Sequence, residues 1–379
     1  MTQPLSEIET ILKESRVIVT VGSGGVGKTT SSIAMALIAA RLGKKVGLLS
    51  IDPAKRLADA LGIKLGSELR RVNLKAEISG SLDAAMLDQK AVFDEMVWRF
   101  APNAGVAEKI FQNSIYKEVS SNLGGPLEYM ALAKLETMLR TGGYDLIVID
   151  TPPDSHALDF LARPNILAGF IETGVMSWMI KPFHLAQKLG VGAIFKAGGK
   201  IMGGISSITG MKMLKLLAEF LVLMEEVIIG FNRVGREVSV ALKSKSTGFV
   251  LVSAPYNNAV RSAQHLLTEL KQNNYPLLAL IMNRNLPFDL QKSVAHYPAL
   301  ESGVDPTLRP GFDILTSRQR YAASLAEQLA SKARESAGKD VHLLLLEEQG
   351  QMIHSEETLW SFADALCNAR SFGDQAQSS

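Results

Sequence analysis

Residues 17–37 constrain the fold most, because a β-branched run, a glycine-rich loop and an apolar helical pattern follow one another there. The run 17–21 predicts a buried strand, and the loop 22–30 has the spacing GxxxxGK[ST]. Glycines let several backbone N–H groups point at one anion, and the helix start adds its positive dipole end. An ordinary glycine-rich turn is the plainer alternative. The spacing favours a phosphate-binding loop whose contacting residues are Gly24, Gly25, Val26, Gly27, Lys28, Thr29 and Thr30.

Two side chains of this loop indicate which ligand it would take. The Lys28 ammonium can reach the β- and γ-phosphates of a nucleotide, and the Thr29 hydroxyl can ligate Mg²⁺. We therefore expect a nucleoside triphosphate and Mg²⁺ as the ligands of this site.

Two later apolar runs each end in an aspartate. Residues 46–51 lead into Asp52, and residues 146–149 lead into Asp150. The carboxyl ends of strands in an α/β sheet are where ligands bind, and a strand ending in aspartate is typical of the carboxylate on the Mg²⁺ side of a nucleotide. Asp52 also fits a helix N-cap, because Pro53 follows it. The two interpretations of Asp52 are compatible, and the preceding phosphate loop favours a role in the site. Both aspartates are therefore candidate site residues.

Composition excludes several classes of function. The chain has 379 residues and a net charge of +2, which gives no reason to expect a nucleic-acid partner. Cys367 is its single cysteine, so an intrachain disulfide and a CxxC metal site are both ruled out. The N-terminal residues have no basic-then-apolar signal pattern, and the longest apolar candidate, 216–231, is interrupted by three glutamates. We expect a cytoplasmic protein, either free in solution or peripheral at a membrane.

The order of predicted elements indicates an α/β fold. Helical patterns at 1–15, 259–270, 317–336 and 359–366 alternate with apolar strand patterns. The later strands are predicted at 247–253, 277–282 and 341–346. This alternation predicts a doubly wound, mainly parallel sheet of the P-loop NTPase type. Its nucleotide-binding domain is expected to comprise residues 1–85, 140–162 and 245–379.

Two helical blocks interrupt the alternation and predict an inserted subdomain at 86–139 and 163–244. The first helical pattern begins near Ser81 and runs to Leu139. The second contains seven glycines between 190 and 210 and then a methionine- and leucine-rich stripe at 211–224. The stripe fits an ordinary helical core, and it also fits an adaptable apolar groove, because methionine side chains repack around varied partners. The glycines suggest a segment that moves or becomes ordered on binding.

These features together resemble the family of arsenite-pump ATPases (ArsA) and tail-anchored-protein targeting ATPases, and its bacterial branch most of all. The resemblance extends through most of the chain, and the Asp-Pro-Ala and Asp-Thr-Pro-Pro stretches are more specific than a phosphate loop alone. The matching segments are 22–30, 51–62, 128–131, 149–161 and 281–284.

The resemblance implies a role for each matching residue. Asp52, in switch I, would orient the attacking water, and Thr29, Asp52 and Asp150 would form the Mg²⁺ side of the site. Residues 151–156 would be switch II, which couples the γ-phosphate to the helical subdomain. Asn283 would contact adenine, and Arg284 would join it in the nucleotide-binding set. A guanine-reading Asn-Lys-x-Asp pattern is absent at 283–286, which favours ATP over GTP.

Three departures from the family pattern limit what can be transferred. Ser23 stands where the family loop has a lysine that crosses to the partner's nucleotide, so Lys55 or Arg56 is a hypothetical substitute for that charge. The zinc-binding CxxC of the eukaryotic targeting ATPases is missing, and so are the arsenite-binding cysteines. A single phosphate loop, in place of the arsenite pump's two, points to a homodimer or to a heterodimer with a paralogue.

The sequence therefore predicts an Mg²⁺-dependent ATP hydrolase, with Lys28 and Asp52 as the catalytic residues. Hydrolysis would change the conformation of the hydrophobic helical subdomain. The alternative is an ATP-switched binding protein or membrane-protein targeting chaperone with slow hydrolysis, whose client is a hydrophobic helix or a membrane partner. A surface-cycling partition ATPase fits less well, because residues 350–379 lack a basic amphipathic tail.

Overall fold

The computed structural model describes residues 4–52, 56–122, 127–152, 208–291, 307, 309–338 and 341–372. The chain divides into two compact units. The first unit comprises Met1–Leu87, Met138–Asp159 and Val240–Ser379, and the second comprises Asp88–Thr137 and Phe160–Ser239.

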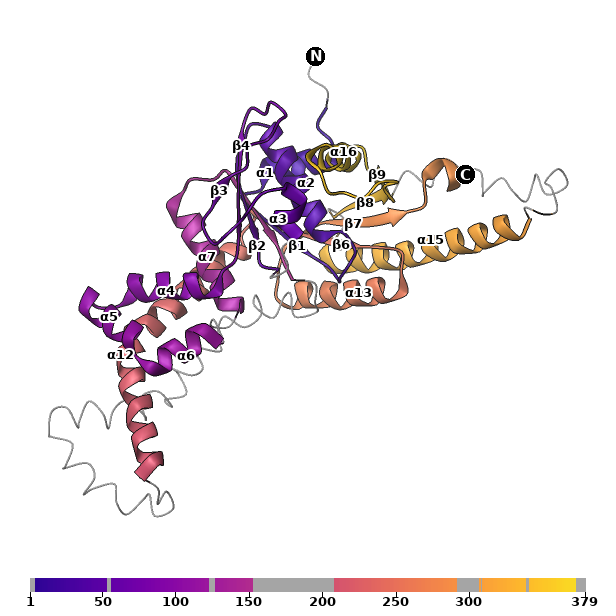
Figure 1. Cartoon of the computed structure of the whole chain (residues 1–379). Coiled ribbons are helices and arrows are strands. Elements are labelled where there is room, and N and C mark those ends of the chain that lie inside the picture. The colour runs from indigo at the N-terminus through magenta and orange to yellow at the C-terminus, as the bar shows by residue number, and fades with distance from the viewer. Residues whose placement is uncertain are drawn as a thin grey trace. The chain divides into compact units, whose positions relative to one another are not determined.

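The described residues of the first unit form a nine-stranded sheet in the order β3-β4-β2-β5-β1-β6-β7-β8-β9 (Figure 1). Neighbouring strands from β4 to β8 are parallel, and β3 and β9 pair antiparallel at the two edges. This topology confirms the predicted α/β fold with a mainly parallel sheet. The strands are β1 Val17–Val21, β2 Lys45–Ser50, β3 Arg70–Arg71, β4 Ser81–Met86, β5 Leu146–Asp150, β6 Thr247–Ser253, β7 Leu277–Asn285, β8 His342–Glu347 and β9 Arg370–Ser371.

The central strands are buried over their whole length, which explains their continuous apolar sequences. Every residue of β1, β5 and β6 is buried. In a sheet covered on both faces a strand needs apolar side chains on both sides, so alternation disappears. The β1–β5 register pairs Thr20 with Asp150, and the β1–β6 register pairs Val21 with Leu251. The parallel pairing therefore brings the ends of these three strands together at one edge of the sheet.

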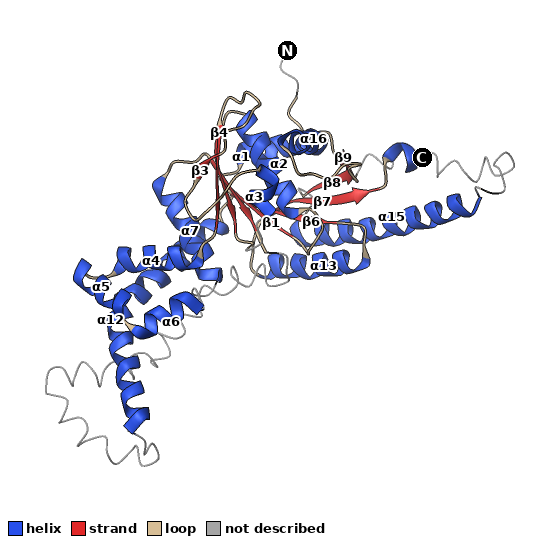
Figure 2. Ribbon diagram, in the orientation of Figure 1, coloured by secondary structure: helices blue, strands red, loops and turns tan. Residues whose placement is uncertain are grey.

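Helices of the first unit cover both faces of the sheet. Figure 2 shows α2 and α16 over one face and α13 and α15 over the other. The phosphate loop leads into α2, whose apolar residues 33–40 are buried in the core with β1, β2 and α16. The helices are α1 Glu7–Glu14, α2 Lys28–Arg41, α3 Arg56–Leu61, α13 Asn257–Gln272, α15 Arg309–Ala337 and α16 Glu356–Cys367.

Two elements differ from the sequence-based expectation. Residues 81–86, expected to begin a helical block, form β4, which pairs with β2 from Lys45↔Ser81 to Ser50↔Met86. Serine, aspartate and alanine have low β propensity, so pairing with β2 outweighs the local preference.

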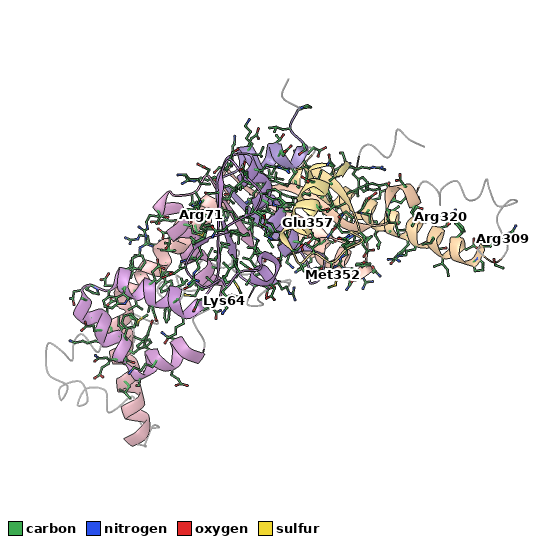
Figure 3. The ribbon with its side chains drawn as sticks, turned by 45° about the horizontal axis from the view of Figure 1, so that its top comes forward. Lys64, Arg71, Arg309, Arg320, Met352 and Glu357 are labelled. Carbon is green, nitrogen blue, oxygen red and sulfur yellow. The ribbon has the colours of Figure 1, made fainter. Side chains whose placement is uncertain are left out.

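Helix α15 begins at Arg309, whereas the sequence predicted a start at residue 317, and it carries Arg309 and Arg320 in its first half (Figure 3). Its buried residues begin at Leu325, so the amphipathic pattern is weak before that point.

The second unit is helical in its described part. Phe93 packs against Tyr116 with ring centroids 5.2 Å apart and against Phe231 at 5.7 Å. Arg99 forms a partly buried, bidentate ion pair with Glu136. Its helices are α4 Gln89–Phe100, α5 Ala104–Gln112 and α6 Ser114–Asn122, together with most of α7 Leu127–Thr141 and α12 Ile208–Leu242.

The methionine- and leucine-rich stripe is only partly described. Phe220, Leu221 and Met224 are buried, as a helical core requires, whereas Leu216 is 43% exposed. The expected glycine-rich segment, up to residue 207, lies outside the described residues, as do residues 163–189. None of the helices in the described ranges combines the length and apolarity that crossing a bilayer requires.

The end of α1 depends on a lysine from the loop before β2. The Lys44 ammonium donates to the carbonyl oxygens of Leu12, Lys13 and Ser15 at 2.6, 2.7 and 3.0 Å. These carbonyls belong to the last turn and C-cap of α1, where an intrahelical partner is missing and a positive charge complements the helix dipole.

Replacing Lys44 should therefore weaken the first unit. We expect Lys44→Met to lower the free energy of unfolding by about 2 kcal/mol, the usual worth of hydrogen bonds from a charged donor. Urea denaturation followed by circular dichroism measures this loss. Lys45→Met is the matched control, because the Lys45 side chain is exposed. Equal stability of the two variants would contradict a capping role.

Candidate functional site

The loop between β1 and α2 has a backbone that only glycine accommodates at two positions. Gly22 has φ +152°, and a Cβ there would lie 2.1 Å from the carbonyl oxygen of Val252 on β6. Gly27 has φ +98°, and a Cβ there would lie 2.5 Å from Nδ2 of Asn283. The loop is thus held closely between β6 and β7. Gly27 is also the N-cap of α2, and it supplies no side-chain cap to the helix N–H groups.

Lys28 lies across this loop. Its side chain is buried, and its ammonium donates to the carbonyl oxygen of Ser23 at 2.9 Å. The positive charge is therefore held next to the start of α2, whose dipole has the same sign there. A polyphosphate is the ligand that this combination of charge and backbone donors suits best.

Asp150, at the end of β5, accepts hydrogen bonds from this region. Its Oδ2 accepts from the Thr29 hydroxyl at 2.9 Å and from the Ser50 hydroxyl at 3.0 Å. Its Oδ1 accepts from the Ser32 hydroxyl at 3.5 Å. Thr29 and Asp150 are the predicted Mg²⁺-side residues, and the structure brings them into direct contact. Ser50 and Ser32 were missed by the sequence analysis, although a serine that ends an apolar strand was a usable signal.

The pKa of the Asp150 carboxyl is raised to about 6. Complete burial of Asp150 is the largest cause, because a carboxylate loses hydration there. The hydrogen bonds from Thr29 and Ser50 and the charge of Lys28 lower this pKa, and the nearby charge of Asp52 raises it. The two predicted aspartates therefore lie close enough for their charges to interact.

Asp52 lies just beyond β2, between that strand and α3. It is 6% exposed, and its Oδ2 is 3.8 Å from Nη1 of Arg56, the first residue of α3. Residues 53–55, which include Lys55, lie outside the described residues. Of the expected switch II, Thr151 is described and donates to the carbonyl oxygen of Thr20 at 2.7 Å, whereas residues 153–156 are outside the described part.

Asn283 contacts the phosphate loop from β7. Its Nδ2 donates to the carbonyl oxygen of Val26 at 2.9 Å, and its Oδ1 accepts from the backbone N–H of Arg284 at 2.8 Å. Arg284 has φ +59° and an exposed side chain. Asn283 therefore holds the loop in place, a role that the sequence analysis did not predict. The contact of Asn283 and Arg284 with a base stays a prediction.

The site offers oxygen ligands for a hard cation. The Thr29 and Ser50 hydroxyls and the carboxylates of Asp150 and Asp52 gather at the ends of β2 and β5 and the start of α2. Within the described ranges, no three or more His, Cys, Asp or Glu side chains form a metal cage. Mg²⁺ commonly uses one or two carboxylates together with substrate phosphates, so this donor set fits it.

The raised pKa of Asp150 predicts a pH-dependent cost of its charge. The folded form binds this proton more tightly than the unfolded chain, whose carboxyl keeps the usual value of 3.8. The contribution of Asp150 to wild-type stability should therefore fall as the pH rises from about 4 to about 6, and this contribution should change no further above that range. Asp150→Asn removes this cost, so in EDTA its advantage in melting temperature should be full at pH 7.5 and shrink toward pH 4. An equal difference at both pH values would contradict the shift.

Comparisons with known proteins agree with this geometry. The model of the family described as "Anion-transporting ATPase" matches residues 15–301. "ATPase get3" of Aspergillus terreus is 35% identical over 162 residues, which are 41% of this chain and 45% of that protein. "ATPase GET3" of Malassezia globosa is 27% identical over 266 residues, 70% of this chain and 71% of that protein. "ATPase GET3" of Mycosarcoma maydis is 33% identical over 146 residues, 38% and 41% of the two chains.

The chain spans less than half the length of two of these relatives. The family match nevertheless covers most of the 379 residues, including the loop, both aspartates and Asn283. It confirms the resemblance to the ArsA and targeting ATPases and the enzyme class that follows from it, an ATP hydrolase. The chain therefore belongs to the anion-transporting ATPase family.

Proposed function

We propose that this chain binds ATP with Mg²⁺ at the loop between β1 and α2, hydrolyses it, and couples the reaction to a conformational change of its helical unit. The observation that carries the proposal is the 2.9 Å hydrogen bond from Thr29 to Asp150. It joins two motifs that lie 121 residues apart in the sequence, and it does so beside the Lys28 ammonium.

Each residue has a chemical role in this reaction. The loop N–H groups and Lys28 hold the β- and γ-phosphates, and Asp52 orients a water molecule toward the γ-phosphorus. The water oxygen forms a new bond to phosphorus, the bond to the β–γ bridging oxygen breaks, and ADP leaves with that electron pair while the water's proton passes to solvent or phosphate. Phosphoryl transfer depends mainly on such positioning and on neutralisation of charge. Bound Mg²⁺, held on the side of Thr29, Asp52 and Asp150, would neutralise phosphate charge.

The chain path supports coupling between the two units. β5 ends at Asp150, and the second unit resumes at Phe160, so the segment after the metal-side aspartate leads from one unit into the other. A change in the position of Asp150, when the γ-phosphate is bound or lost, would thus be passed along the chain to the start of the helical unit. We propose that the segment beginning at Thr151 is the switch that transmits this change.

The expected partners follow from the same proposal. A single phosphate loop suits a homodimer or a heterodimer with a paralogue. The second unit carries exposed apolar side chains, Trp98 at 53%, Leu216 at 43% and Ile229 at 45%, which suit a hydrophobic helix or a membrane partner. We place the protein in the cytoplasm, with peripheral contact to a membrane when such a client is delivered.

The alternative function is an ATP-switched binding protein with slow hydrolysis. In this alternative, ATP controls the affinity for a client, and hydrolysis is slow. A fluorescent hydrophobic helical peptide should bind with an affinity that depends on ATP if the alternative holds. Binding that ATP leaves unchanged, or no binding, would leave the ATPase function alone.

Substitution of the two catalytic residues tests the reaction. We expect Lys28→Ala and Asp52→Asn each to lower kcat by roughly two to three orders of magnitude, because each removes charge or alignment used in the transition state. Phosphate release with Mg²⁺, and again with excess EDTA, measures both kcat and metal dependence. Asp59→Asn is the matched control, since Asp59 is an exposed aspartate on α3. Turnover of Asp52→Asn at the wild-type rate would refute the water-orienting role.

Hydrogen exchange tests the coupling. A non-hydrolysable ATP analogue and ADP, each with Mg²⁺, should give different backbone protection in α4 and α12, because the switch would transmit the presence of the γ-phosphate. Mass spectrometry of the exchanged peptides measures this, and Lys28→Ala should show no difference. Protection that changes only in the first unit would contradict coupling.

A further inference from the structure

The charges around the proposed site are divided into two pairs. Asp150 lies near the Lys28 ammonium, and Asp52 lies 3.8 Å from the Arg56 guanidinium. Lys28 is the one charged side chain in residues 22–30. Ser23 has no charge, and its carbonyl oxygen accepts a hydrogen bond from the Lys28 ammonium. Arg56 is therefore the second cation that the described residues place at the site's acidic side chains.

Arg56 is held in a way that allows exchange of partners. It precedes the rest of α3 and stands four residues after Asp52, so its side chain returns toward the end of β2. The Asp52 side chain is 7% exposed, whereas the Arg56 side chain is 57% exposed. The separation of 3.8 Å is long and the guanidinium is mostly in water, so the attraction that holds Arg56 to Asp52 is weak enough for a more highly charged partner to replace it.

We propose that Arg56 transfers its guanidinium from Asp52 to the γ-phosphoryl group of bound ATP and stabilises the charge of the transition state. This inference rests on the proposed function, because it assigns a further catalytic residue to the same site. Asp52 would orient a water molecule that lies against the γ-phosphorus, so the cation paired with Asp52 stands on the side of the site where the transferring oxygens would lie. The guanidinium fork matches phosphate oxygens in pairs. Its departure also frees the Asp52 carboxylate to accept a hydrogen bond from the water.

Three variants of the full chain separate this role from a structural one. Arg56→Gln removes the charge, and Arg56→Lys keeps the charge without the fork. Arg71→Gln is the matched control, because Arg71, which Figure 3 labels on β3, is 58% exposed. Its ion-pair partner is Asp83. For each variant we would measure kcat and KM for ATP and the affinity for Mg·ADP. We would also measure the affinity for Mg·ADP with aluminium fluoride, which imitates the transferring phosphoryl group.

We expect Arg56→Gln to lower kcat by roughly 10³-fold, as loss of a catalytic arginine does in related chemistry. The affinity for the aluminium fluoride complex should fall in proportion, while the affinity for Mg·ADP changes by less than about twofold, because only transition-state contacts are lost. Arg56→Lys should lie between Arg56→Gln and the wild type, and Arg71→Gln should match the wild type.

Two outcomes would overturn the inference. One is a kcat of Arg56→Gln within threefold of that of Arg71→Gln. The other is an equal loss of affinity for Mg·ADP and for its aluminium fluoride complex, which would show that Arg56 only supports the binding site. Failure of the proposed function is distinguishable from both, because wild-type chain would then neither bind Mg·ATP nor release phosphate.

Discussion

The buried carboxylate of Asp150 is the interaction on which the arrangement of the site depends. The β1–β5 pairing places it beside the phosphate loop, and complete burial makes its charge costly. The cost is offset by donors from two other elements, Ser50 of β2 and Thr29 of α2, and by the charge of Lys28. The start of α2, the end of β2 and the end of β5 are thus tied to one pair of oxygens. The Thr29 hydroxyl donates its hydrogen to Asp150 and keeps its oxygen lone pairs for a metal, so a metal bound to Thr29 would be linked to the position of Asp150.

Much of this could be predicted from the sequence because the signals are local. The spacing from Gly22 to Thr30 requires a turn of fixed shape, and the apolar runs before Asp52 and Asp150 are long enough to be recognised as buried strands. Parallel pairing then places the ends of such strands at one edge, so contact between Thr29 and Asp150 follows from topology. The family resemblance added the likeness of residues 281–284, which pattern alone would have left as the end of a strand.

What the sequence analysis missed depends on contacts between distant segments. β4 lacks β-branched residues, and its pairing with β2 is visible only in the folded chain. Ser50 and Ser32 are common residues at ordinary positions, and only their distance to Asp150 gives them a role. The contact of Asn283 with Val26 is of the same kind, because the two residues are 257 positions apart. It places the Asn283 amide against Gly27, where φ +98° already favours glycine.

The pairing of charges relates the loop to α3. Burial and the nearby charge of Asp52 make the charge of Asp150 costly, and the described residues provide a cation near each carboxylate, Lys28 for Asp150 and Arg56 for Asp52. These two cations differ in freedom, because Lys28 is buried and bonded to the loop whereas Arg56 is mostly exposed. A triphosphate bound as we propose would add several negative charges to these two pairs. Arg56 is the more exposed of the two cations and is therefore the one that we propose to change partners, from the first residue of α3, directly after the segment that follows Asp52.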